Sequence, residues 1–297
     1  MNKRIKALLL VAVTSLSVVG CSSVKDDDVR VMRVAHNQGE DHPIHLALKE
    51  FIAVGSISLL ESFNKSYSVF NLPYLFDSTE HYHEVMNDDD IMNGVYESTR
   101  DAGFVGLTWF DAGSRNMYTT DKAIMTPEDL KGKKIRVQQS QTNIRMMELL
   151  GGSATPMSFG EVYTAIQQGV IDGAENNELA LTSNKHGEVA KYYSYNQHAM
   201  VPDILIMNAK LLDSLSKEHR NIILDAADTI NKFEVDAWED KVNEAVEQAK
   251  EMGVEFYYPD IEPFKEKVLP LHKEMTTDKE VKALYDKIQA KAPKEDK

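Results

Sequence analysis

Residues 131–140 (KGKKIRVQQS) contain an arginine whose role its neighbours leave open. Arg136 alternates with Ile135 and Val137, as in a strand that buries one face. A guanidinium presents a planar fork of donors that fits a carboxylate through two parallel hydrogen bonds, so Arg136 could grip an organic acid in a cleft. The alternation alone favours a plainer interpretation, in which Arg136 faces solvent from an amphipathic strand and Arg115 is a surface turn residue.

The other reactive residue types form no catalytic or metal-binding pattern. His36, His42 and His45 lie near two acidic residues, but their spacing fits no closed structural zinc site. A capping role before the helix that follows is the favoured interpretation. The sequence contains no hydrolase elbow, zinc-protease helix or phosphate loop. We therefore expect no enzyme activity, no cofactor and no bound metal.

The N-terminus has the pattern of an export signal. Three cations precede an apolar run at 7–19, which is too short to span a bilayer comfortably. The run ends in VVGC, which resembles the cleavage box of bacterial lipoproteins, and Cys21 is the single cysteine of the chain. We expect removal of a signal peptide at 1–20 and lipidation of Cys21, with 21–28 as a tether. An uncleaved anchor is the alternative.

The chain is acidic, with 47 Asp and Glu against 33 Lys and Arg and a formal net charge of −14. Loss of the leader, which carries three cations and no anion, makes this charge more negative by three. Such a surface repels nucleic-acid phosphates and anionic lipid headgroups. We therefore expect no nucleic-acid partner, and contact with the membrane only through the N-terminal lipid.

Strands and helices alternate along the chain, which predicts an α/β fold with largely parallel sheets. Strands are expected at residues 29–35, 104–110, 115–119, 134–138, 170–175 and 200–207, and helices at 43–51, 88–102, 141–150 and after Ser158. Residues 216–252 contain no Pro or Gly and keep a roughly helical apolar period. A helix of this length reaches about 50 Å and should cross two domains.

Four segments carry a resemblance to a known family. The sequences LKGKKIRV at 130–137, TPM at 155–157, EVYTAIQ at 161–167 and VIDGAEN at 170–176 follow one another in this order. Together with NLPYLF at 71–76 and the long helix, they resemble the dicarboxylate-type (DctP-like) substrate-binding proteins of TRAP transporters, which are extracytoplasmic solute receptors. The resemblance runs from about residue 29 almost to the C-terminus.

The resemblance implies a two-domain, periplasmic-binding-protein-like fold with a ligand cleft between the domains and the long helix spanning both. Domain I is expected to comprise residues 29–112 plus 202–241. Domain II is expected to comprise residues 113–201 plus 242–297.

The resemblance also implies the residues of the cleft. Arg136 would pair with the carboxylate of the ligand, and Arg115 would reach the same ligand. Four further positions would line the cleft: Asn176, Phe159, Asn37 and Gln139.

The implied function is capture of a small organic acid and its delivery to a TRAP permease in the membrane, by a monomeric receptor that faces the periplasm or the cell exterior. The segments HNQ at 36–38, GSRNMY at 113–118 and VPD at 201–203 resemble branches of the family that take sugar acids such as hexuronates. A C4-dicarboxylate is the second candidate ligand.

Domain I looks short near residues 51–52. The family usually places more than thirty further residues after the first helix, whereas here that helix runs into the next segment without a turn signal. We predict an internal deletion with its seam at Phe51–Ile52; a naturally compact branch is the alternative. A deletion opens a second functional possibility, namely a lipoprotein with a structural or partner-binding role that has lost ligand binding.

Overall fold

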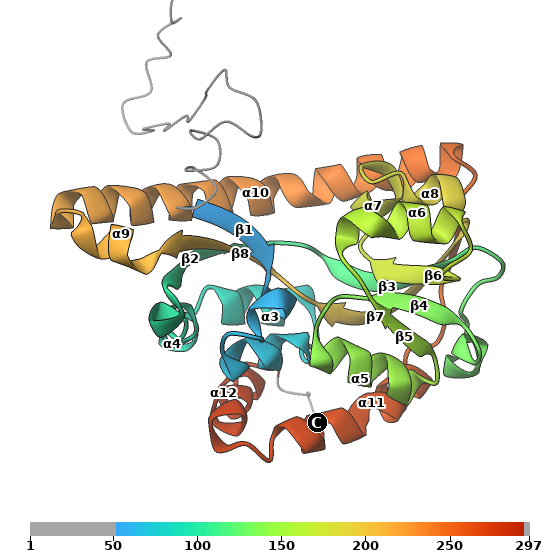
Figure 1. Cartoon of the computed structure of the whole chain (residues 1–297), viewed down its shortest axis with the longest axis horizontal. Helices are drawn as coiled ribbons and strands as arrows, with labels where there is room; N and C mark the ends of the chain where they lie inside the picture. The colour runs from blue at the N-terminus through green and yellow to red at the C-terminus, as the bar shows by residue number, and fades with distance from the viewer. Residues whose placement is uncertain (1–51, 294–297) are drawn as a thin grey trace, which may run out of the picture. The chain divides into compact units, whose positions relative to one another are not determined.

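Two β-sheets form the centre of the structure (Figure 1). Sheet A has the strand order β1-β8-β2, and sheet B has the order β5-β4-β6-β3-β7-β9. The bounds are β1 Ile52–Ser56, β2 Phe104–Phe110, β3 Ser114–Thr119, β4 Lys134–Val137, β5 Ser153–Pro156, β6 Gly173–Asn176, β7 Tyr192–Met200, β8 Asp203–Asn208 and β9 Glu255–Tyr257. Strands and helices alternate through most of the chain, so the α/β class is confirmed.

The computed structural model describes residues 52–293, and all of them belong to one compact unit. The predicted signal peptide, tether and first strand lie outside the described residues, as do Cys21, Asn37 and the three N-terminal histidines.

The prediction of largely parallel sheets is wrong for the described strands. Both pairs of sheet A are antiparallel, and sheet B combines three parallel pairs with two antiparallel ones. The reason is that the chain crosses from sheet A to sheet B at 111–113 and returns at 201–202. Because the two crossings run in opposite directions, β2 lies antiparallel to β8, and β3 lies antiparallel to β7.

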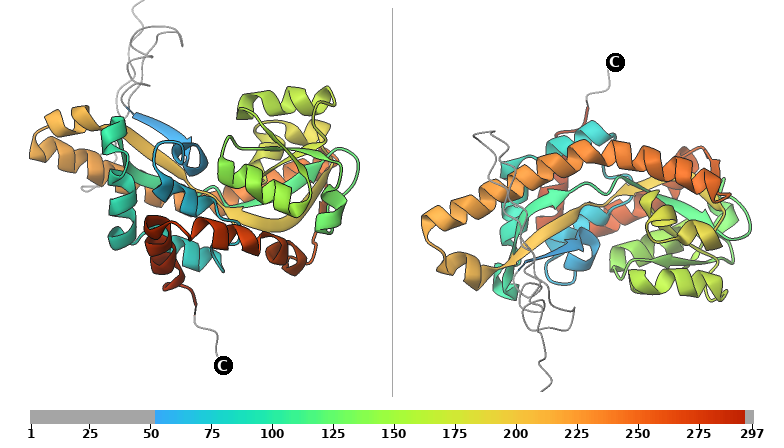
Figure 2. Two further views of the ribbon diagram at one scale, coloured as in Figure 1. Left: turned by 60° about the horizontal axis from the view of Figure 1, so that its bottom comes forward. Right: turned by 90° about the horizontal axis from the view of Figure 1, so that it is seen from above.

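Helices cover both sheets (Figure 2). Their bounds are α2 Ile57–Leu60, α3 Thr79–Met86, α4 Asp89–Glu97, α5 Gln141–Leu150, α6 Val162–Gln167, α7 Leu179–Thr182, α8 His186–Val189, α9 Ala209–Ser214, α10 Lys217–Glu251, α11 Glu262–Met275 and α12 Lys279–Gln289. The helix α5 coincides with its prediction, because the Ser140 side chain caps its first turn and Gly151 ends it in the left-handed conformation. The helix predicted at 88–102 is shorter: α4 stops at Glu97, and a separate 3₁₀ turn ends at Gly103.

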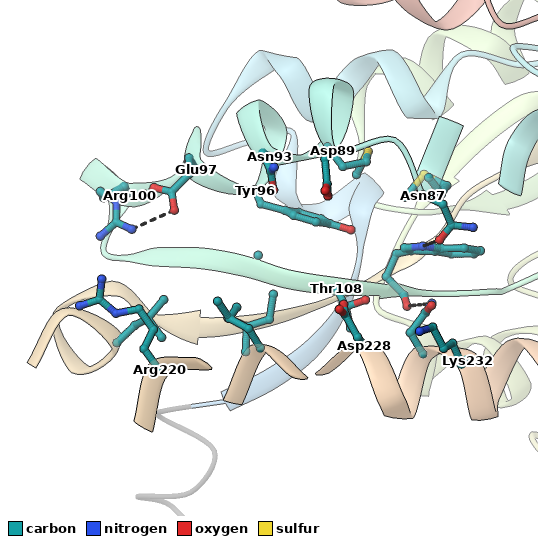
Figure 3. A pocket seen from close by; sticks show the side chains of 18 residues that line it. Asn87, Asp89, Asn93, Tyr96, Glu97, Arg100, Thr108, Arg220, Asp228 and Lys232 are labelled. Carbon is teal, nitrogen blue, oxygen red and sulfur yellow. Dashed lines mark hydrogen bonds and ion pairs between the residues drawn. The ribbon is translucent and has the colours of Figure 1, made fainter. Parts of the chain in front are cut away.

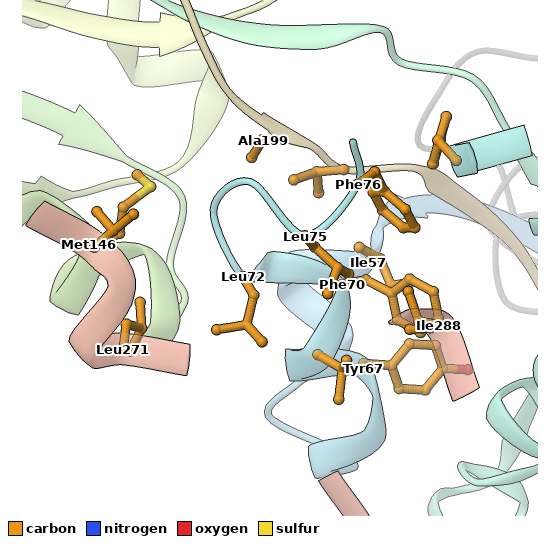
Figure 4. Packing of buried hydrophobic residues seen from close by; sticks show 14 of the residues in the cluster. Ile57, Tyr67, Phe70, Leu72, Leu75, Phe76, Met146, Ala199, Leu271 and Ile288 are labelled. Carbon is orange, nitrogen blue, oxygen red and sulfur yellow. The ribbon is translucent and has the colours of Figure 1, made fainter. Parts of the chain in front are cut away.

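The largest apolar core lies below the sheets and joins distant parts of the chain (Figure 4). Ile57, Phe70 and Leu75 from the N-terminal half pack with Met146 of α5 and Leu271 of α11. One face of strand β4 packs in this core, since its Ile135 and Val137 are fully buried there. The side of β4 that carries Arg136 is thereby directed away from the core.

Helix α10 has 35 residues and runs past both sheets, which confirms the predicted spanning helix (Figure 1). Ala227 packs in a cluster with residues of β2 and β8, whereas Ala249 packs with residues of sheet B. Between them, the Asn231 side chain donates a hydrogen bond to the Trp109 carbonyl at the end of β2 (2.7 Å). No helix within residues 52–293 is both long enough and apolar enough to cross a membrane.

A close backbone approach sets the spacing of β3 and β6. A Cβ atom added at Gly173 would overlap the Tyr118 carbonyl oxygen of β3. We predict that Gly173→Ala lowers the free energy of unfolding by about 1–3 kcal/mol, because the two strands must move apart. Gly94→Ala is the matched control: this exposed glycine of α4 has open space around it, and alanine there should stabilise by about 0.5–1 kcal/mol. Urea unfolding measures both; equal effects would contradict the strand-spacing argument.

Candidate functional site

A cavity of about 580 Å³ lies where the edges of the two sheets meet, and we call it the intersheet cavity. Sheet A and its crossing segments contribute Ser56, Asp111 and Asp203. Sheet B and the loops that follow its strands contribute Arg115, Arg136, Gln139, Phe159 and Asn176. Five of the six predicted ligand-binding residues therefore line one cavity, and the sixth, Asn37, lies outside the described residues.

The strand directions explain why these residues meet. Strands β5, β4 and β6 are parallel, so their carboxyl ends share one edge of sheet B. The chain leaves these ends through Gln139, Phe159 and Asn176. Strand β3 runs the opposite way, which brings its second residue, Arg115, to the same edge. Ligand sites of open α/β sheets form outside the carboxyl ends of the strands.

Arg136 is buried, with 4% of its surface exposed, so the interpretation as a solvent-facing residue is wrong. Its Nε and one terminal nitrogen both donate to the Met157 carbonyl, at 3.1 and 3.0 Å. The Phe159 ring lies 5.5 Å from the guanidinium carbon, in the range of a cation–π contact. Burial lowers the pKa of Arg136, and no carboxylate within residues 52–293 forms an ion pair with it.

Arg115 is equally buried, which corrects its interpretation as a surface turn residue, but its charge is already paired. It donates to both carboxylate oxygens of Glu175, one of them at 3.0 Å, and to the Glu175 carbonyl at 2.8 Å. Its remaining nitrogen donates to the Asn176 side chain at 2.9 Å. Burial alone would raise the pKa of Glu175, but Arg115 and His198 together hold it at about 2. The pair therefore adds little net charge to the cavity.

Aromatic side chains and a neutral histidine surround the Arg136 guanidinium. The Tyr118 hydroxyl and His186 Nδ1 are 2.7 Å apart, and the His186 ring contacts Phe159 edge to face. Burial, together with the charge of Arg136, lowers the pKa of His186 to about 4. His186 is therefore uncharged at neutral pH, and Arg136 supplies the positive charge in this part of the cavity.

Two neighbouring glutamines have different positions. Gln139, predicted to contact the ligand, is exposed at the rim of the cavity. Gln138 is buried, and its side-chain amide donates to the Ser56 hydroxyl of sheet A at 2.8 Å. The Asn143 side chain donates to the Gln138 Oε1 at 3.1 Å. Gln138 thus links the two sides of the intersheet cavity along one wall.

A second cavity of about 540 Å³ lies between α4, α10 and the outer edge of β2 (Figure 3). Its lining mixes both charges, and Arg100 is already paired with Glu97 and Asp213. None of the five predicted ligand-binding residues that the structure describes lines it. Residues 52–293 also contain no group of His, Cys, Asp or Glu side chains that could hold a metal ion.

Sequence reasoning missed two acidic residues of the site. Glu175 lies inside the VIDGAEN segment, but nothing in its neighbours indicates that it neutralises Arg115, sixty positions away. The sequence indicates Asp203 only as the last residue of the VPD segment, and its place in the cavity depends on the return crossing between the sheets.

Comparisons with known proteins identify the class. The profile of the family described as bacterial extracellular solute-binding protein, family 7 (DctP), matches residues 47–279. The chain belongs to this family of substrate-binding receptors for transport, and the predicted resemblance to TRAP solute-binding proteins is confirmed.

Solved structures and a curated relative show the same likeness. A TRAP periplasmic solute-binding protein from Anaerococcus prevotii, solved with α/β-D-glucuronate, is 52% identical, with a TM-score of 0.80 over 84% of this chain and 82% of the other. One from Xanthobacter autotrophicus, solved with β-D-galacturonate, is 34% identical, with a TM-score of 0.78 over 82% and 83%. The uncharacterized protein YiiZ of Salmonella typhimurium is 42% identical over 88% of this chain and 82% of its own length.

The Arg115–Glu175 pair generates a prediction about stability. Glu175→Gln should lower the free energy of unfolding at pH 7 by about 3–5 kcal/mol, because Arg115 would be left as a buried, uncompensated cation. The pKa of Glu175 is about 2 in the folded chain against an ordinary value of 4.5. Its contribution is therefore complete above pH 4.5 and is lost as the pH falls towards 2.

Urea unfolding at pH 7 and pH 3 measures this difference. The difference in the free energy of unfolding between the parent chain and Glu175→Gln should be smaller at pH 3 than at pH 7. Glu247→Gln, which alters an exposed pair with Lys250 on α10, should change stability by less than about 0.5 kcal/mol at either pH. A gap that stays constant with pH would contradict the assignment.

Proposed function

We propose that this chain is an exported, lipid-anchored receptor that captures a sugar acid, such as a hexuronate, in the intersheet cavity and delivers it to a TRAP permease. Arg136 pairs with the ligand carboxylate. Arg115 and Asn176 contact the same ligand, and the Phe159 ring packs against it. Asn37 is proposed as a further contact on the basis of the resemblance, and Gln139 on the basis of its position after the arginine-bearing strand.

One observation carries the proposal: Arg136 is a buried cation in a cavity, with no carboxylate partner within residues 52–293. A buried charge without a partner is costly, and a ligand carboxylate would remove that cost. The guanidinium fork matches the two oxygens of a carboxylate. Arg115 cannot take this role alone, since Glu175 already neutralises it.

The choice of a sugar acid rests on the relatives. The two solved TRAP proteins described above hold glucuronate and galacturonate, and one is 52% identical to this chain. Such ligands carry one carboxylate and several hydroxyl groups, which a cavity with one uncompensated cation can accommodate. A C4-dicarboxylate, with two negative charges and few hydroxyls, is the second candidate.

The two crossings between the sheets support a closing motion. They lie at 111–113 and 201–202, next to the predicted domain boundaries, and both sides contribute residues to the cavity. We propose that domain I comprises residues 29–112 plus 202–241, that domain II comprises residues 113–201 plus 242–297, and that ligand contacts from both favour the closed form. The permease then recognises the closed, monomeric receptor.

A second candidate function follows from an exposed apolar edge. Ile52 and Val54 of β1, which is an edge strand of sheet A among the strands that the structure describes, are 40% and 54% exposed. This exposure favours the predicted deletion at 51–52, which removes neighbouring chain and bares apolar residues. If the deletion has abolished ligand binding, the chain retains only a structural or partner-binding role.

Titration calorimetry with D-glucuronate tests the proposal. The parent chain should bind it, and a ligand-dependent rise in the melting temperature should accompany binding. Arg136→Gln, which removes the cation, should weaken binding by about 30- to several-thousand-fold. Arg136→Lys should also weaken it, by about tenfold or more, because the lysine keeps the charge but loses the fork. Arg145→Lys, at an exposed ion pair on α5, is the matched control and should bind normally. No binding of any hexuronate or dicarboxylate by the parent chain would favour the second candidate instead.

Lipidation of Cys21 has its own test. Cells that express the full chain should incorporate labelled palmitate into it, and the protein should fractionate with membranes. Cys21→Ser should abolish both the label and the membrane association, because no other cysteine is present. Membrane association that persists in Cys21→Ser would indicate an uncleaved anchor.

A further inference from the structure

Asp203 is an acidic side chain in the same cavity as Arg136 that the proposed function does not use. It is the first residue of β8, the central strand of sheet A, and is paired there with Ser56 and Phe110 at the ends of the neighbouring strands. Its side chain is half-buried and lines the intersheet cavity. Within residues 52–293 its carboxylate has no hydrogen-bond or ion-pair partner, whereas Asp111 beside it is paired with His83 at 2.7 Å.

The cavity is therefore polarised. Arg136 projects from sheet B and Asp203 from sheet A, and neither has a charged partner among the described residues. Arg136 does not neutralise Asp203, since the two form no ion pair. Arg115 is the cation whose charge lowers the pKa of Asp203, but Arg115 already forms an ion pair with Glu175.

We propose that Asp203 is the specificity-determining residue of the cavity: it accepts hydrogen bonds from the hydroxyl groups of a sugar acid and repels a second carboxylate. This inference rests on the proposed function, because it takes the ligand's first carboxylate to be held by Arg136. A ligand with an acid group at one end and hydroxyls at the other matches the two ends of the cavity.

The energetics of the unliganded cavity support this role. Burial raises the pKa of Asp203, and Arg115 only partly opposes the rise, so the charged form is less favourable here than in water. Hydroxyl donors from a ligand would replace the lost hydration. Hydrogen bonds to a charged acceptor are about twice as strong as neutral ones. A second carboxylate placed there would instead meet a like charge, next to Asp111.

The choice between ligands follows from this asymmetry. A site built to hydrogen-bond hydroxyl groups discriminates strongly against ligands that leave its polar groups unpaired. Succinate has no hydroxyl that could donate to Asp203, and its second carboxylate would point towards the Asp203 carboxylate. D-Glucarate is an open-chain sugar acid that keeps several hydroxyls but carries a second carboxylate in place of the anomeric carbon of D-glucuronate. The parent chain should therefore bind D-glucuronate more tightly than either.

The test compares Asp203→Asn with the parent chain by calorimetry, using D-glucuronate, D-glucarate and succinate. The variant should bind D-glucuronate about 10- to 100-fold more weakly, since a charged acceptor becomes a neutral amide. The preference for D-glucuronate over D-glucarate should shrink by at least a similar factor. Asp225→Asn, an exposed residue of α10 with the same change in charge, is the matched control and should leave all affinities unchanged.

Melting of the unliganded variant distinguishes ligand recognition from a structural role. Removing an unpaired carboxylate should leave the melting temperature unchanged or raise it. A large fall in both Asp203→Asn and Asp203→Ser would show that Asp203 supports the fold, and would overturn the inference. An unchanged ligand preference in a folded variant would overturn it as well. Failure of the parent chain to bind D-glucuronate, D-galacturonate or any other sugar acid would instead refute the proposed function, so the two failures are separable.

Discussion

The site depends on one constraint: a buried guanidinium, Arg136, that pairs with no carboxylate within residues 52–293. Arg136 is held by a single backbone carbonyl and an aromatic ring, whereas Arg115, its neighbour in the cavity, is fully engaged by Glu175 and Asn176. Glu175 thus neutralises one of the two cations, and we propose that the other, Arg136, holds the ligand carboxylate. The surrounding charge of the chain is strongly negative, but remote charges are screened over about 8 Å at physiological salt, whereas a contact inside the cavity is not.

The rest of the fold keeps this guanidinium in place. Ile135 and Val137 anchor one face of β4 in the main core, so Arg136 must point to the other face. The parallel strands beside β4 bring Phe159 and Asn176 to the same edge. Helix α10 holds the crossing after β2, since Asn231 and Glu234 bind the backbone of Trp109 and Asp111. The two sheets can therefore present residues to one cavity without sharing a continuous strand ladder.

Several helices could be predicted from the sequence, because their capping residues and glycines, or the absence of Pro and Gly, mark them clearly. Capping residues and glycines defined α5, and the absence of Pro and Gly defined α10. Strand β7 was missed, since its buried face carries Ser194, Asn196 and His198, which read as polar and exposed. Alternation alone placed Arg136 in solvent; only the order of several motifs indicated a cleft. The sequence did not predict Glu175 and Asp203 as residues of the site, because their roles depend on partners brought close by the crossings between the sheets.

The central claim is that Arg136 exists to hold a carboxylate, and a change of one group on the ligand tests it most directly. Calorimetry of the parent chain with D-glucuronate and with D-glucuronamide compares a charged acid with its neutral, nearly isosteric amide. The account predicts that the amide binds at least a hundredfold more weakly, about 2.7 kcal/mol. Equal affinity for the two would contradict it, because the guanidinium would then make no use of the charge.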